Sequence, residues 1–394
     1  MPVNNRIADL ADEMTEWRQE MHKHPETAFE EVWTSAYIKE RLDTFGMDEI
    51  HTGIAKTGIV AVLKGQGDSD RAIGIRADFD ALDILELNDL PYKSQNPGKM
   101  HACGHDGHTA MLLGAAKYMA ETRNFDGTVY FIFQPAEENE GGGRVMVEEG
   151  LFDRFPMEAV YGMHNSPGLP IGQISMGPGP MMAGYDIFEI TIDGYGTHAA
   201  RPHQGVDPVI VQAQIVMALQ TIASRQTDAI DSVVLSITQV HGGDTYNVIP
   251  QQVKLRGTVR SFKPEMQDLV EEKMNKLCAA IASAYDAKVD VHYERRYPPT
   301  VNDPAHTDFC AEIARSLVGD DNVNTKARPV MGSEDFSFML QEKPGCYIRM
   351  GNGEVGGKGG VVVHNPHYNF NDEALPWGAT YWAEIAEKSL PRKA

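Results

Sequence analysis

Residues 100–108 (MHACGHDGH) place one thiol and three imidazoles within nine residues, the densest group of transition-metal ligands in the chain. The side chains that could complete a metal site lie far away along the chain, at Glu138, His164 and His364. Zinc fingers differ from this pattern because their ligands lie close together in sequence. A site built from these residues therefore requires a large fold that brings distant segments together, which is typical of an enzyme centre.

Cys103 and His105 are the strongest candidate metal ligands in this run. A single cysteine is most often a buried small hydrophobic residue, and a single histidine most often has a structural role. Those interpretations weaken here because the thiol and the imidazoles crowd one short loop that leads into a helix. We expect His101 and His108 to have structural roles or to orient the ligands through hydrogen bonds.

The acidic pair Glu137-Glu138 follows an apolar segment and Gln-Pro-Ala, and it leads into the glycines at 141–143. Such a pair is usually no more than a solvated acidic turn. Here the glycines allow the backbone to approach a ligand closely, and adjacent residues of an extended loop point to different sides. We therefore predict that Glu138 binds metal while Glu137 faces the reacting water and accepts its proton.

Short apolar runs alternate with helical patterns in the first half of the chain. We predict strands at 71–77, 128–133 and 159–163, and helices at 7–21, 108–121 and 142–150. This alternation predicts an α/β fold, in which a mostly parallel sheet is covered by helices on both faces. Ligands of such sheets bind beyond the carboxyl ends of the strands. Asp78, Glu137-Glu138 and His164 each lie just past a predicted strand, which supports the metal site independently.

The pattern changes after residue 185. We predict strands from 186 and at 232–240, 252–260 and 288–295, with a helix from Pro208 capped by Asp207 and a helix at 264–284. This β-α-β-β-α-β order is that of a ferredoxin-like domain. We therefore predict an inserted α+β domain at 186–297. The flanks, 1–185 and 298–394, are predicted to form one discontinuous metal-binding catalytic domain, since His364 follows the insertion and the other candidate ligands precede it.

Charge and composition exclude some classes of partner. The formal net charge of −21 argues against nucleic acid, whose binders carry basic patches. The four cysteines show no close pairing, which favours free thiols in a reducing compartment. Asp9, Asp12 and Glu13 stand where a signal peptide would need an apolar core, and no apolar run reaches the roughly 18 residues of a membrane span. We therefore expect a cytoplasmic protein that does not bind membranes.

The chain resembles the N-acyl-amino-acid amidohydrolases, metallopeptidase relatives that include hippurate hydrolases, acetyl-diaminopimelate deacetylases and auxin-conjugate hydrolases. The resemblance covers nearly the whole chain, and so many motifs in a fixed order are highly specific. The motifs are WRQEMHKHPE at 17–26, GIRADFDAL at 74–82, MHACGHDGHTAML at 100–112, FQPAEENEGGG at 133–143, GMHNSPGLPIG at 162–172, GTHAARPHQGVDP at 196–208, NVIP at 247–250, GTVRSF at 257–262, MGSEDFSF at 331–338 and HNPHYNFND at 364–372.

The resemblance implies a set of site residues. Two divalent ions would be held by the five candidate ligands Cys103, His105, Glu138, His164 and His364. Glu137 would act first as general base and then as general acid. The wider metallopeptidase group has a metal-binding histidine where this chain has Arg76, which leaves the role of Asp78 open. The ligand types suit zinc, cobalt or nickel, and the carboxylate also admits manganese.

The resemblance also gives the inserted domain a role, as a lid and a dimerisation surface. His198 would enter the active site of a partner subunit and stabilise the oxyanion, in a homodimer or homotetramer. Asn247 and Arg260 would hold the substrate carboxylate, and Gly332, in MGSEDFSF, would contact substrate. Taken alone, the segment around His198 could be a structural turn and Arg260 a surface charge.

The sequence therefore predicts a metal-dependent enzyme that hydrolyses the amide bond of N-acyl-L-amino acids, such as hippurate-like or N-acetyl substrates. One alternative makes Cys103 a nucleophile activated by a histidine, but it leaves Glu138, His164 and His364 without a function. A second alternative is a binding protein of the same fold that captures a metal or an acyl-amino acid without catalysis. The intact Glu137 argues against it, because binding does not require a base.

Overall fold

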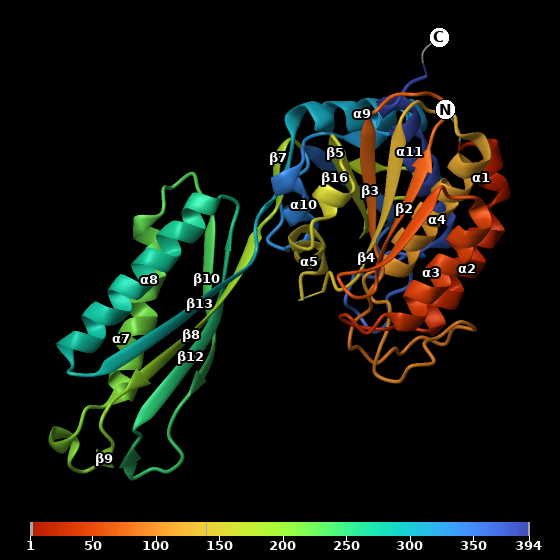
Figure 1. Cartoon of the computed structure of the whole chain (residues 1–394). Helices are drawn as coiled ribbons and strands as arrows, with labels where there is room; N and C mark the ends of the chain where they lie inside the picture. Colours follow the sequence, from red (N-terminus) through yellow and green to blue (C-terminus); the bar gives the residue numbers. More distant parts are fainter. Residues whose placement is uncertain (1–2, 139, 393–394) are drawn as a thin grey trace. The chain divides into compact units, whose positions relative to one another are not determined.

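The computed structural model describes residues 3–138 and 140–392, whose elements are labelled in Figure 1. The chain forms two compact units, and each is described by itself. Unit 1 comprises Met1–Met181, Val301–Arg328 and Asp335–Ala394. Unit 2 comprises Met182–Thr300 and Pro329–Glu334.

Unit 1 is built on an eight-stranded sheet with a parallel centre. In order across the sheet, its strands are β1 (Glu49–Ile54), β2 (Gly58–Lys64), β4 (Thr128–Gln134), β3 (Ala72–Asp78), β5 (Ala159–Pro167), β16 (Gly345–Gly353), β6 (Ile174–Ser175) and β15 (Val323–Asn324). Strands β4, β3, β5 and β16 pair in parallel, whereas β1, β2 and β6 join the sheet by antiparallel pairs. The predicted α/β class with a mostly parallel sheet is confirmed.

Helices cover both faces of this sheet. One face packs against α3 (Val32–Phe45), α4 (His105–Thr122), α9 (Pro304–Val318) and α11 (Leu375–Ser389), and α2 (Ala11–Lys23) packs on α4 and α11. The other face packs against α5 (Gly142–Glu148) and α10 (Phe336–Glu342), and α6 (Leu151–Arg154) follows α5. Figure 1 shows α5 and α10 on one side of the sheet and α2, α3 and α4 on the other.

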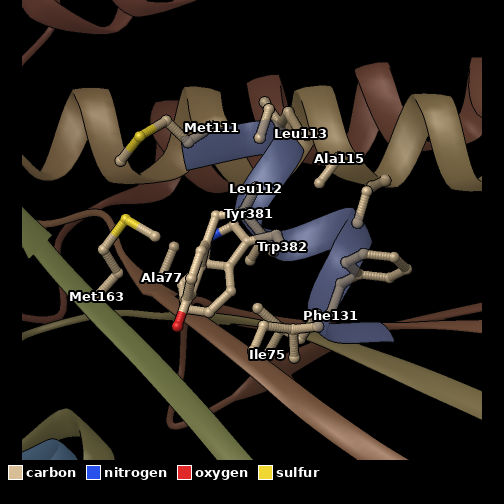
Figure 2. Close-up of a cluster of buried hydrophobic side chains, with 14 of the residues drawn as sticks. Ile75, Ala77, Met111, Leu112, Leu113, Ala115, Phe131, Met163, Tyr381 and Trp382 are labelled. Carbon is tan, nitrogen blue, oxygen red and sulfur yellow. The ribbon is translucent and has the colours of Figure 1, made fainter. Parts of the chain in front are cut away.

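The main core lies between the sheet and the larger helical layer. Figure 2 shows Trp382 of α11 packed among side chains of α4 and of the central strands, including Met111, Ile75 and Phe131. Full burial of a side chain of this size stabilises the fold by roughly 2 kcal/mol. Because strand residues alternate between faces, the core-facing positions of β3, β5 and β16 also fix which residues point to the opposite face.

The predicted first helix, 7–21, is instead two helices. Helix α1 (Asn5–Asp9) is capped by the Asn4 side chain, and Leu10 separates it from α2. The Leu10 N–H donates to the carbonyl of Ile7, which is a tighter turn than an α-helix makes. The apolar spacing still predicted burial correctly, since Ile7, Leu10 and Met14 all lie in the core.

Unit 2 has the predicted β-α-β-β-α-β order. Its elements are β8 (Gly184–Asp193), α7 (Pro208–Thr221), β10 (Val233–His241), β12 (Gln252–Ser261), α8 (Pro264–Ala284) and β13 (Lys288–Tyr297). The sheet order is β10-β12-β8-β13, entirely antiparallel, and α7 and α8 pack on it. The predicted cap of α7 is confirmed, because the Asp207 side chain accepts a hydrogen bond from the Val209 N–H.

Short elements complete the two units. They are η1 (Pro202–Gln204), η2 (Ile222–Gln226), η3 (Asp320–Asn322), η4 (Asp372–Ala374), the paired strands β9 (Thr197–His198) and β11 (Val248–Ile249), and the paired strands β7 (Gly179–Met182) and β14 (Thr300–Asn302). The four cysteines are unpaired, as the sequence predicted. Among the described residues, no helix combines the length and the apolar character needed to cross a membrane.

Candidate metal centre

The carboxyl ends of the central strands bring the candidate ligands of unit 1 together. Asp78 ends β3, Glu138 follows β4, His164 lies near the end of β5, and α4 begins at His105. The ligand atoms form overlapping groups, within each of which all atoms lie within 4.8 Å of one another. The groups are Cys103–His105–His164, Cys103–Glu138–His364, His105–Glu137–Glu138 and Asp78–His105–His108.

Two imidazoles are held so that one nitrogen of each faces this cluster. His105 Nδ1 lies 3.0 Å from Asp80 Oδ1, and His164 Nδ1 lies 2.6 Å from the carbonyl oxygen of Asn165. Both acceptors require a proton on Nδ1, which leaves the Nε2 lone pair for another partner. His105 Nε2 is buried without any hydrogen-bond partner, and His164 Nε2 lies 3.3 Å from Cys103 Sγ. This is the arrangement of metal-binding histidines, whose second nitrogen donates to an oxygen.

The loop that carries Cys103 is shaped by Gly104 and tied to the last candidate ligand. Gly104 has a φ of +102°, and a Cβ there would lie 2.4 Å from Asn165 Oδ1 and 2.5 Å from the Tyr368 hydroxyl. Only glycine fits this position. The His364 N–H donates to the Ala102 carbonyl at 2.7 Å, and His364 Nε2 lies 3.0 Å from Glu138 Oε1. The distant segment at 364 is therefore fixed beside the Cys103 loop.

The loop that carries Glu137 and Glu138 is anchored at both ends by Asp335. The Asp335 carboxylate accepts hydrogen bonds from Gln134 Nε2 at 2.8 Å and from the Gly143 N–H at 2.7 Å. Gln134 precedes the acidic pair and Gly143 follows it. Glu137 is buried, at 7% exposure, and its carboxylate belongs to the same group as His105 and Glu138.

The electrostatics of the cluster fit a cation. Burial, with the negative charges of Glu138 and Glu137, raises the pKa of the Cys103 thiol well above its usual value. Burial opposes a charge on His105, but the carboxylates of Asp78 and Asp80 outweigh it and raise its pKa to about 10. A buried pocket that binds protons this strongly has an excess of negative charge, which a divalent ion would neutralise in their place. Together with the unpartnered His105 Nε2, this donor set fits a metal site.

Asp78 and His108 hold each other rather than presenting free ligand atoms. Asp78 Oδ1 lies 2.6 Å from His108 Nδ1, and Asp78 Oδ2 accepts a hydrogen bond from Arg76 Nη1 at 2.7 Å. His108 Nε2 accepts a hydrogen bond from the Asn165 N–H at 3.1 Å. His101 is buried, and burial lowers its pKa to about 4, so its imidazole is neutral at physiological pH.

Asp80 is a site residue that the sequence analysis missed. Its Oδ1 lies 3.0 Å from His105 Nδ1, and its Oδ2 accepts a hydrogen bond from the Glu138 N–H at 3.0 Å. One buried carboxylate therefore orients two candidate ligands from different loops. The available signal was its position two residues past the end of β3, the same kind of position that pointed to Asp78, Glu137-Glu138 and His164.

In unit 2, His198 on β9 lies close to Asn247, which directly precedes the paired strand β11. His198 of β9 pairs with Val248 of β11, and the Ala199 N–H donates to the Asn247 carbonyl at 2.9 Å. The His198 Nδ1 accepts a hydrogen bond from the Ala200 N–H at 3.0 Å, and the residue is exposed. The His198 Nε2 is therefore directed away from the local backbone contacts.

Arg260 and Gly332 lie together at the other end of the unit 2 sheet. Arg260 Nη1 donates to Ser333 Oγ at 3.1 Å, and the guanidinium lies 4.0 Å from the centre of the Tyr185 ring. Arg260 is eight residues from Gln252, the first residue of β12, which places it roughly 26 Å from the His198 end. Within one copy of unit 2, Asn247 and Arg260 therefore do not converge on one carboxylate.

Comparisons with known proteins give one consistent family. Residues 74–388 match Peptidase family M20/M25/M40. The chain is 40% identical over 384 residues to a hippurate hydrolase from Campylobacter jejuni, a match that covers 98% of both chains. It is 39% identical over 370 residues to an N-acetylcysteine deacetylase from Bacillus subtilis, covering 94% of both chains. Its fold is similar to that of a solved dinuclear metal-binding peptidase from Bacillus subtilis, with a TM-score of 0.84, 36% identity and coverage of 97% of this chain and 99% of that one.

Proposed function

The chain belongs to Peptidase family M20/M25/M40, and we propose that it hydrolyses the amide bond of N-acyl-L-amino acids to a carboxylic acid and a free amino acid. The observation that carries this function is the cluster of five candidate ligands, of which Cys103 and His105 are buried, with the buried Glu137 beside it. That cluster occurs in a chain that matches hydrolases of such substrates along nearly its whole length. The enzyme is therefore a metal-dependent amidohydrolase.

Two divalent ions are the cofactor that this cluster would hold. Two of its groups, Cys103–His105–His164 and Cys103–Glu138–His364, share the thiol and offer nitrogen, sulfur and oxygen donors. Such donors suit zinc, cobalt, nickel or manganese. When bound, the ions make water more acidic and polarise the amide carbonyl.

Glu137 is the acid-base residue of the proposed reaction. Its carboxylate lies in the same group as His105 and Glu138, so it is within reach of water at the cluster. It would accept the proton of the attacking water and then pass that proton to the nitrogen of the leaving amino acid. The Gln134 and Gly143 contacts of Asp335 would hold the Glu137 loop in place during both transfers.

We also propose roles for the unit 2 residues. His198 would stabilise the oxyanion of the tetrahedral intermediate, while Asn247 and Arg260 hold the substrate carboxylate and Gly332 lines the substrate site. The separation of His198 and Asn247 from Arg260 along one sheet supports a shared site, in which the first two come from a partner subunit. Each site would then take its Arg260 from one copy and its His198 from the other.

A homodimer or homotetramer would provide that partner. Unit 2 offers apolar residues for such an assembly, because Ile210 and Met217 on α7 are 51% and 71% exposed and Val240 on the edge strand β10 is 53% exposed. An exposed strand edge with apolar neighbours is a surface that tends to pair. We accordingly propose unit 2 as a lid and dimerisation domain. The four unpaired thiols support a reducing, cytoplasmic location.

The Cys103-nucleophile alternative is disfavoured by the state of the thiol. A catalytic cysteine needs a lowered pKa, because the thiolate is the attacking form. Burial and the surrounding carboxylates instead raise the pKa of Cys103. The hydrolysis assay distinguishes a non-catalytic binding protein from an enzyme.

The test is a hydrolysis assay on metal-reconstituted protein, with hippurate, N-acetylcysteine and other N-acyl amino acids as substrates. Release of the free amino acid in proportion to loaded metal supports the function. Binding of the same compounds without release would identify a non-catalytic binding protein. Activity that requires the Cys103 thiol but no metal would favour the nucleophile mechanism.

A further inference from the structure

Two arginines, Arg76 and Arg349, share the sheet face of unit 1 that is opposite the main core. The core-facing residues are Ile75 and Ala77 on β3, Tyr161 and Met163 on β5, and Ile348 and Met350 on β16. By strand alternation, Arg76, His164 and Arg349 point to the other face. Arg76 and Arg349 therefore lie on the same face as a candidate metal ligand.

Arg76 is a structural cation on this face. It is 1% exposed, and its guanidinium is paired with Asp78 at 2.7 Å and with Asp335 at 3.0 Å. It also donates to Gln134 Oε1 at 2.8 Å. The carboxylates of Asp78 and Asp335 neutralise the charge of Arg76, and we assign Arg76 a structural role alone.

Arg349 differs because it has no carboxylate partner. Among the described residues, no acid forms an ion pair with it, and its guanidinium donates to the Met181 carbonyl at 3.1 Å. Burial lowers the pKa of Arg349, and Tyr347 opposes this shift only in part. One carbonyl engages one of the five N–H donors of a guanidinium, so most of these donors have no acceptor among residues 3–138 and 140–392.

Arg349 lies on the strand next to a candidate metal ligand. In the parallel pair β5–β16, Arg349 stands in register with His164. Registered residues of neighbouring strands point to the same side, and adjacent strands lie about 4.8 Å apart. The preceding residues on this face, Gly162 and Tyr347, are buried, whereas His164 and Arg349 are both partly exposed. The face therefore opens to solvent at the level of these two side chains.

We propose that Arg349 binds a carboxylate of the substrate and so determines which N-acyl amino acids the enzyme prefers. This inference rests on the proposed function. A planar guanidinium with N–H groups left over can donate to both oxygens of a carboxylate. The bound carboxylate would also supply the negative charge that no described acid provides to Arg349. The α-carboxylate is assigned to Asn247 and Arg260, so the carboxylate that Arg349 binds is a side-chain carboxylate, as in glutamate, or a carboxylate on the acyl group, as in a succinyl amide.

The test compares acids with neutral isosteres that differ at one of these positions. N-benzoylglutamate and N-benzoylglutamine report on the side chain, and N-succinylglycine and N-succinamoylglycine report on the acyl group. Hippurate and hippuramide differ only at the α-carboxylate and serve as the control pair, whose two members Arg349→Gln should change alike. Arg349→Gln removes the charge but keeps an N–H donor for the Met181 carbonyl. Arg349→Lys keeps the charge without the fork. Arg71→Gln is the matched control, because Arg71 is an exposed arginine paired with Glu158.

The expected result is selective. For either the glutamate pair or the succinyl pair, Arg349→Gln lowers kcat/KM for the acid by roughly 10- to 150-fold, mainly through KM, and changes the neutral isostere less than threefold. Arg349→Lys recovers part of the loss, while Arg71→Gln changes neither member of any pair. The pair that responds identifies the source of the carboxylate.

An equal decrease for acids and isosteres, or no change for any pair, would overturn the role of Arg349 and leave it a structural donor to Met181. If the wild-type enzyme hydrolysed none of these six compounds and none of the other N-acyl amino acids in the hydrolysis assay, the proposed function would be refuted instead. In that case, the affinities of wild type and Arg349→Gln for the same pairs, measured by calorimetry, still test whether Arg349 binds a carboxylate. Selective loss of affinity for one acid supports it, and equal affinities refute it.

Discussion

Replacing Asp80 with asparagine should weaken metal binding without unfolding the protein. The two oxygens of Asp80 serve two donors, His105 Nδ1–H and the Glu138 N–H, each at 3.0 Å. An asparagine amide has the same shape but offers one oxygen and one NH2 group. Whichever way the amide turns, one of the two donors faces another donor. Either His105 or Glu138 then loses the hydrogen bond that orients it.

The size of the effect follows from these contacts. An unsatisfied buried donor costs about 1–3 kcal/mol, and a factor of ten in affinity corresponds to about 1.4 kcal/mol. The metal affinity of Asp80→Asn should therefore fall roughly 10- to 100-fold, which is also the usual effect of losing a residue that orients a metal ligand. Because the metal ligands themselves are intact, saturating metal should restore most of the turnover.

The measurement is a zinc or cobalt titration of metal-free protein in competition with a chromophoric chelator. Asp83→Asn is the matched control, because Asp83 is an exposed carboxylate in the same segment. Similar melting temperatures of the metal-free variants would show that both are folded. A dissociation constant for Asp80→Asn within twofold of wild type would refute the argument that Asp80 positions His105 and Glu138.

Three further predictions concern the proposed reaction and its metal cofactor. Glu137→Gln should lower turnover roughly 100- to 10,000-fold while metal content stays near wild type; loss of metal in Glu137→Gln, with metal and activity kept in Glu138→Gln, would invert the two roles. Metal affinity should rise with pH, by up to about 100-fold per pH unit between pH 6 and 8. The reason is that the raised pKa values of Cys103 and His105 keep both groups protonated, so that metal binding releases two protons. A metal affinity that does not change with pH, measured by calorimetry, would contradict this. Subunit exchange between inactive His198→Ala and Glu137→Gln homodimers should restore about a quarter of the sites if His198 acts across a twofold interface, whereas activity that stays low despite exchange confirmed by native mass spectrometry would place His198 elsewhere.

Local patterns predicted much of the fold. Apolar runs at 128–133 and 159–163 became β4 and β5, and the order of elements after 185 became the antiparallel sheet of unit 2. The break at Leu10 could not be predicted, since the apolar spacing continues through it, while α1 ends in a tight turn from the Leu10 N–H to the Ile7 carbonyl.

The candidate ligands were visible in the sequence because thiol, imidazole and carboxylate groups follow strand ends or crowd one loop. The residues that position them were not visible. Asp80 and Asp335 act through hydrogen bonds to segments as far away as Glu138 and Gly143. Asp80 follows the end of a strand, but nothing in the local sequence of either residue indicates which distant groups it binds. The same holds for Arg349, whose register with His164 exists only once β5 and β16 pair.

Catalysis should depend on metal held by the cluster around Cys103, His105 and Glu138. The most direct measurement removes metal with a chelator, verifies the removal by elemental analysis, and follows hippurate hydrolysis as a divalent ion is added back. We predict no turnover by the metal-free protein and recovery that reaches its maximum at two ions per subunit. Full turnover by protein shown to contain no metal would contradict this dependence.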